Sequence, residues 1–128
     1  MAESTLLKEP LTQEMIDLGV GLLRVLDAMN IPVSSAFWLF DEEVNGWKLK
    51  LAAANTEITY HQIADARRAL GLSREQFPLD LVSITDTRNE IVRALHAEFS
   101  EGPYTTPKRL GRGAIRGRFI DDAYVYKA

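Results

Sequence analysis

The sequence contains no cysteine among its 128 residues, so disulfides, thiolate metal sites and thiol nucleophiles are all excluded. It also lacks any apolar run close to the roughly 18 residues that a membrane-spanning helix requires. Its first 14 residues carry acidic side chains where a secretory signal peptide would begin with basic ones. We therefore expect a cytoplasmic protein that does not bind membranes.

The composition is typical of a single folded domain, with 46% apolar and 26% charged residues. A chain of this length buries roughly two thirds of the surface that it exposes when unfolded, so it can build a core without covalent staples. The sequence shows no internal repeat and no low-complexity tract that would divide it. We predict one domain over residues 1–128, with residues 1–10 as a flexible end closed by Pro10.

Positive charge is concentrated near the carboxyl end, although the net charge of the chain is −3. Residues 1–107 hold nine Lys and Arg against sixteen Asp and Glu. A local cluster of cations can bind nucleic acid if folding gathers it on one face. The segment 108–118 contains five cations and no acid, and we call these five the basic stripe: Lys108, Arg109, Arg112, Arg116 and Arg118.

Periodicity predicts a helix of about 16 to 18 residues that follows Thr12, a typical N-cap. Asn30 ends it, because asparagine tolerates a left-handed C-cap and Pro32 cannot continue a helix. Gly19 and Gly21 weaken the helix locally but would permit close packing against a neighbour. The apolar stripe recurs at spacings of three and four and comprises Met15, Leu18, Leu22, Val25, Leu26 and Met29.

Two strands follow, at residues 33–40 and 47–53, because both segments are rich in β-branched or aromatic residues or alternate in polarity. The dipeptide Asn45-Gly46 between them accepts positive φ, so we expect an antiparallel hairpin.

Two further helices are predicted from capping boxes, Thr59-x-x-Gln62 and Thr87-x-x-Glu90. Gly71 should end the first of them, with Leu72 folding back on its last turn. A strand at 79–85 lies between the two helices.

After the last helix, residues 100–113 read as a long loop. Segments 114–120 and 123–126 then form one bent strand, or a hairpin turned at Asp121-Asp122. The element order αββαβαβ(β) predicts an α+β two-layer sandwich, with three helices covering one face of a mixed or antiparallel sheet of four or five strands.

Catalytic and metal-binding patterns are weak. His61 has Asp65 at i+4, but a solvated helix face explains the pair as well, and His96 has no second ligand at i+3 or i+4 that would make a helical metal pair. Convergence of Asp86 with Asp121 or Asp122 would be needed for a carboxylate metal site. We predict no catalytic residue, no metal and no cofactor, and keep a metal-dependent enzyme built on Asp86, Asp121 and His61 as a lesser alternative.

The basic stripe supports two interpretations. In a strand, Arg116 and Arg118 would share one face, where exposed arginines could follow a phosphate backbone. The same arginines could instead pair with Asp121, Asp122 and helix acids, or with an acidic partner protein. The nucleic-acid alternative would use Arg109, Arg112, Arg116 and Arg118.

Aromatic residues on the first strand indicate a contact surface. Phe37 lies on one face of the strand, and Trp38 and Phe40 lie on the other. Helices on one side of the sheet would leave one set uncovered, and exposed rings of that size commonly recruit another subunit. Loops or the amino-terminal segment could also cover them. We predict partner-binding residues at Trp38, Phe40, Tyr124 and Tyr126.

Three segments, VSSAFWLF, NGWKLKLAA and IDDAYVYKA, resemble stretches of small uncharacterised bacterial α+β proteins with AFW, W-x-L and terminal DAYVY-like strands. The resemblance implies a bacterial source and a single α+β fold, and no activity. We expect a non-enzymatic interaction module, either homo-oligomeric or a small accessory subunit of a larger protein.

Overall fold

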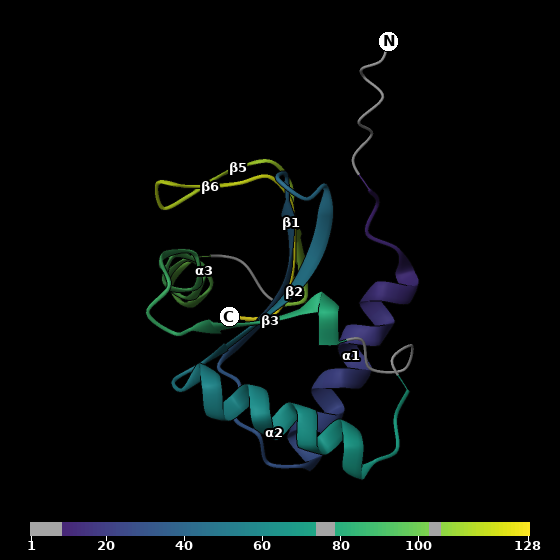
Figure 1. The fold of residues 1–128 in the computed structure, drawn as a ribbon. Helices are drawn as coiled ribbons and strands as arrows, with labels where there is room; N and C mark the ends of the chain where they lie inside the picture. Colours follow the sequence, from purple (N-terminus) through teal and green to yellow (C-terminus); the bar gives the residue numbers. More distant parts are fainter. Residues whose placement is uncertain (1–8, 74–78, 103–105) are drawn as a thin grey trace.

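A computed structural model describes residues 9–73, 79–102 and 106–128, so most of the end predicted to be flexible, residues 1–8, lies outside the described part. Its three helices and mixed five-stranded sheet, with a separate two-stranded hairpin, confirm the α+β class and the predicted order of elements (Figure 1). No helix of the described residues is both long and apolar enough to cross a membrane. The elements are α1 (Gln13–Ala28), β1 (Ser35–Asp41), β2 (Gly46–Ala53), α2 (Thr56–Ala69), η1 (Leu79–Leu81), β3 (Val82–Asp86), α3 (Glu90–Glu101), β4 (Lys108–Leu110), β5 (Gly113–Ile115), β6 (Arg118–Ile120) and β7 (Ala123–Lys127).

Helix α1 begins and ends as its sequence predicts. The Thr12 side chain accepts a hydrogen bond from the Met15 amide at 3.2 Å. At the other end, Asn30 has a φ of +56°, and the Ile31 amide donates back to the Leu26 carbonyl. This left-handed ending satisfies carbonyls that would otherwise lack donors at the end of the helix.

The sheet contains the predicted β1–β2 hairpin, whose turn includes Asn45 at a φ of +47°. Its strand order is β3-β2-β1-β7-β4, in which β7 pairs antiparallel with β1 and β3 pairs parallel with β2. Residues Phe40 and Trp47 lie opposite each other across the hairpin, and their rings meet edge to face with centroids 5.4 Å apart. Both rings are on the same face of the sheet.

The starts of α2 and α3 differ from the predicted capping boxes. Asn55 caps α2 by accepting from the Ile58 amide, which places Thr59 inside the helix, where it is buried. Asn89 caps α3 by accepting from the amides of Ile91 and Val92. In both cases an asparagine, which is at least as good an N-cap as threonine, stands within four residues of the predicted cap.

The predicted end of α2 is confirmed. Gly71 adopts a φ of +65°, and the Leu72 amide donates to the Arg67 carbonyl, as in a Schellman motif.

The region after α3 contains more strand than predicted. Strand β4 lies within the segment 100–113 that was expected to be a loop. The hairpin β5–β6 turns at Arg116 and Gly117, with φ values of +49° and +82°, and not at Asp121-Asp122. Two successive positive φ values form the tight turn that suits the twist of a hairpin, and glycine adopts one of them without strain. Arg116 is therefore a turn residue and does not share a strand face with Arg118.

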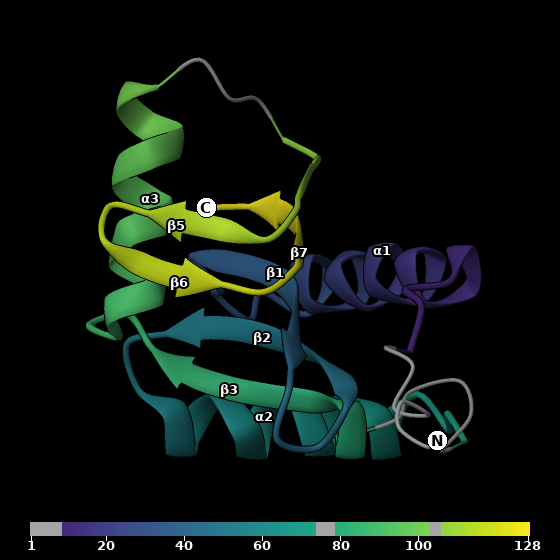
Figure 2. The ribbon, with the colours of Figure 1, turned by 90° about the horizontal axis from the view of Figure 1, so that it is seen from above.

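Helices cover both faces of the sheet, whereas the sequence predicted helices on one face only. Helices α1 and α2 lie on one side, and α3 lies on the other with the β5–β6 hairpin extending across it (Figures 1 and 2). We call these sides the α1/α2 face and the α3 face. Each has its own buried cluster, with Trp38, Leu49 and Leu51 in the first and Phe37, Leu95 and Val125 in the second.

Candidate functional site

The predicted aromatic contact surface on β1 is wrong, because both of its rings are inside the molecule. Trp38 is 0% exposed and Phe40 is 7% exposed. They belong to the buried cluster beneath α1 and α2, while α3 shelters Phe37 on the other face. Because the helices divide between the two faces, each set of rings has its own cover. Trp38 and Phe40 therefore do not form an exposed anchor for a partner.

Tyr124 and Tyr126 lie on the same face as Trp38, as their alternation predicted, and also pack against this core. The Tyr126 hydroxyl accepts a hydrogen bond from the Trp38 indole nitrogen at 2.8 Å and donates to the Ile16 carbonyl of α1 at 2.7 Å. A Cβ atom at Gly19 would overlap this hydroxyl, so glycine is what lets α1 approach the sheet so closely. Burial is the main reason that the pKa of Tyr126 rises to about 12. The role of Tyr126 in the fold is to join α1 to β1 and β7.

The basic stripe is divided between the two faces of the sheet. Arg109 pairs across β4 and β7 with Tyr124, and its guanidinium lies 5.4 Å from the centre of the Trp47 ring, on the α1/α2 face. Two hydrogen bonds of 2.7 Å bind it to the carboxylate of Asp122, which raises the pKa of Arg109. A continuous nucleic-acid surface would need all of these cations on one face of the sheet. Arg109 does not meet that condition.

The cations of the β5–β6 hairpin pair with acids of the same chain. Arg116 contacts Glu98 at 3.2 Å and Glu101 at 2.7 Å, and Arg118 contacts Glu90 at 2.8 Å, all three acids being on α3. These ion pairs connect the hairpin to α3 and favour the intramolecular interpretation of the stripe. Binding of nucleic acid by these arginines stays an untested prediction.

Arg112 is bound more loosely than the others. Its nearest acid, Asp121, is 3.8 Å away, and its side chain is 73% exposed. The guanidinium stacks on the ring of Phe119, which is itself 54% exposed, at 5.3 Å from the ring centre. Phe119 and Arg112 together form an apolar and positively charged surface on the hairpin, which we call the β5–β6 arm.

The carboxylates considered for a metal site do not converge. Asp86 is at the carboxyl end of β3, whereas Asp121 and Asp122 precede β7, which runs parallel to β3, so they lie at opposite ends of the sheet. Two hydrogen bonds from the Arg88 side chain lower the pKa of Asp86 to about 2.

The histidines do not complete a metal site either. Asp65 pairs with Arg68 at 3.1 Å, although it is spaced to meet His61. The His96 ring contacts the Ala128 carbonyl at 3.4 Å. Within residues 9–73, 79–102 and 106–128, no group of three or more metal-ligating side chains comes together.

A groove of about 1160 Å³ lies between α1, α2 and η1. Its apolar lining comes from Met15, Leu18, Leu79 and Leu81, and Tyr60, at 46% exposure, contributes its ring. The polar lining is mostly acidic and comprises Glu14, Asp17, Asp80, Thr12 and one cation, Arg67. No pattern in the sequence predicts this groove, because its lining residues come from three separate segments of the chain.

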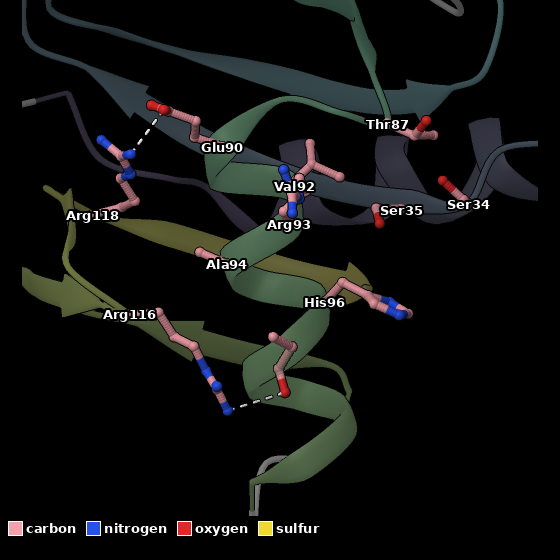
Figure 3. A pocket seen from close by; sticks show the side chains of 11 residues that line it. Ser34, Ser35, Thr87, Glu90, Val92, Arg93, Ala94, His96, Arg116 and Arg118 are labelled. Atoms are coloured by element: carbon pink, nitrogen blue, oxygen red, sulfur yellow. Dashed lines mark hydrogen bonds and ion pairs between the residues drawn. The ribbon is translucent and has the colours of Figure 1, made fainter.

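A second hollow, of about 690 Å³, surrounds the outer part of α3. Figure 3 shows Ser34, Ser35, Thr87 and His96 on one side of the helix, and Arg116 and Arg118 on the other. The serines precede and begin β1, and Thr87 follows β3, so the fold joins hydroxyl groups that no sequence motif connects.

Comparisons with known proteins return no match, since no family model fits the chain and no curated protein or solved structure is significantly similar to it.

Proposed function

We propose that the protein is a non-enzymatic, self-associating binding module. In this proposal the acidic groove between α1 and α2 of one copy receives the β5–β6 arm of a second copy. The observation that carries it is the match between an apolar groove with an acidic rim and an exposed apolar arm with a positive charge.

The groove offers an apolar floor and unneutralised acids. Asp17 accepts a hydrogen bond from the neutral amide of Gln13 at 2.9 Å, and neither it nor Glu14 forms an ion pair with any residue that the structure describes. Apolar surface gains free energy when it leaves water, at roughly 25 cal/mol per Å². A positively charged, partly apolar segment is therefore the occupant that both features favour.

The arm supplies the complementary chemistry. More than half of Phe119 is exposed, and the only acid that contacts the guanidinium stacked on it, among the residues that the structure describes, is Asp121 at 3.8 Å. Aromatic and arginine side chains are the residues that most often dominate the energy of protein interfaces. Docking Phe119 against the apolar floor would bring Arg112 to the acidic rim.

The arm and the groove lie on opposite sides of the molecule, since the arm extends over α3 and the groove lies between α1 and α2 (Figure 1). The arm thus cannot fill the groove of its own chain, but it can fill that of a second copy. Such a contact is heterologous, and head-to-tail contacts of this kind produce rings or open chains.

Sedimentation velocity over a range of protein concentrations tests the proposal. We expect mass to increase with concentration at low salt and to fall as salt screens the charges. Asp17→Lys and Arg112→Glu should each weaken association, roughly tenfold, and the double variant should recover it because the charges are exchanged. Glu43→Lys, an equal charge change in the exposed β1–β2 turn, is the matched control.

A mass of one protomer at every concentration and salt level would overturn the proposal. Association that neither Asp17→Lys nor Arg112→Glu weakens relative to the Glu43→Lys control would place the interface elsewhere and overturn it as well.

A further inference from the structure

The side chain of Ser35 places a hydroxyl group in the interior of the protein, where polar groups usually have hydrogen-bond partners. The residue is 2% exposed, and its hydroxyl forms no hydrogen bond with any residue of the described part. A buried hydroxyl without a partner is destabilising, because it has given up its hydrogen bonds to water. Figure 3 shows this hydroxyl pointing into the hollow, toward the side of α3 that carries His96.

Other hydrogen-bond donors line the same hollow. Thr87 contributes a second hydroxyl and Arg93 a guanidinium, while His96 presents an imidazole ring. Ser34 also lies there, but its hydroxyl already contacts the Ala52 carbonyl at 3.3 Å. Hydroxyl and guanidinium groups are typical ligands for carboxylates and phosphates, which they bind through charge-assisted hydrogen bonds.

The balance of charge on this side of α3 also favours an anion. Arg93 forms no ion pair with a residue that the structure describes, so its charge is available to a ligand. Glu90, which lines the hollow, already pairs with Arg118 at 2.8 Å, and Asp86, the residue before Thr87, is held by Arg88. The lining residues therefore offer hydroxyl groups to a cation, but no unpaired carboxylate.

We infer that this hollow is a binding site for a small oxyanion, a phosphate or carboxylate group of a small molecule. Ser35, Thr87 and Arg93 are its donors, and the buried side chain of Val92 lies beside them. The site is on the α3 face, so the inference is independent of self-association through the groove between α1 and α2.

Isothermal titration with inorganic phosphate and, separately, with acetate tests the site and distinguishes tetrahedral from planar anions. We expect saturable binding of at least one of the two in the millimolar range. Ser35→Ala and Arg93→Gln should each weaken it at least about tenfold, since each removes a hydrogen bond to a charged group. Arg24→Gln, which removes an exposed arginine from α1, is the matched control and should leave the affinity unchanged.

Ser35→Ala is informative because it deletes a hydroxyl that has no partner among the described residues, so the thermal stability of the variant should equal or exceed that of the unmodified protein. No saturable binding of either anion up to about 100 mM, well above the expected range, would overturn the inference. Binding that survives both Ser35→Ala and Arg93→Gln would overturn it too.

Discussion

The two faces of the sheet are held together in different ways. On the α1/α2 face, large rings are buried under two helices, and one hydroxyl, that of Tyr126, connects Trp38 to the backbone of α1. On the α3 face, the core is built around Phe37 and aliphatic side chains, and the hairpin is attached by ion pairs whose partners are partly exposed. The first face relies on exclusion of water and the second, at its edge, on charge.

This difference predicts where the molecule is strong. An aromatic side chain buries about 150–250 Å², at roughly 25 cal/mol per Å², whereas an exposed ion pair contributes at most about 1 kcal/mol. Changes under α1 should therefore affect the unfolding of the whole domain. Changes at the hairpin should open the hairpin locally and leave the rest folded.

Gly19→Ala should have the largest effect of the substitutions considered. The added methyl group would overlap the Tyr126 hydroxyl, so α1 must move away from the sheet. We expect a loss of about 3 kcal/mol in the free energy of unfolding, measured by urea denaturation. Gly21→Ala is the control, because no atom lies within 4 Å of the added group; there alanine should stabilise α1 by up to about 1 kcal/mol. Equal effects of the two variants would show that the close contact of α1 is unimportant.

High pH should weaken the α1/α2 face through Tyr126. Its pKa is about 12 in the folded protein against 10 for a free tyrosine, so the folded state holds the proton more tightly. The resulting stability is complete below pH 10 and is lost as the pH rises toward 12. Urea denaturation at a series of pH values measures this loss. Tyr126→Phe should be less stable at neutral pH and should lose less stability over that interval, and a Tyr126→Phe profile parallel to the unmodified one would contradict the assignment.

Local features of the fold were predictable because they depend on a few neighbouring residues. The Thr12 cap, the Asn45-Gly46 turn and the ending at Gly71 each follow from backbone preferences within one turn of chain. The predicted capping boxes at Thr59 and Thr87 are wrong for a local reason too, since nearby asparagines occupy the N-cap positions of both helices.

The division of helices between faces could not be predicted in this way. An apolar stripe on a helix shows which side is buried, but it does not show which face of a sheet buries it. Because the sequence does not show which helix covers which face, it wrongly predicts that Trp38 and Phe40 are exposed. The hollow beside α3 was missed for a related reason, because Ser35 and Thr87 meet only through the pairing of β1, β2 and β3.

The smallest effect is expected at the hairpin turn. Arg116→Gln removes two partly exposed ion pairs to α3, which together contribute about 1 kcal/mol or less. The global free energy of unfolding should therefore hardly change. Amide hydrogen exchange should nevertheless quicken in β5 and β6 and stay constant in β1 and β2, because the hairpin loses contacts to α3 that the sheet does not share. High salt should reproduce the effect in the unmodified protein by screening the same charges. If exchange quickens equally in β1 and β2, the hairpin and the sheet unfold as one unit, and the contrast between the two faces does not extend to their stability.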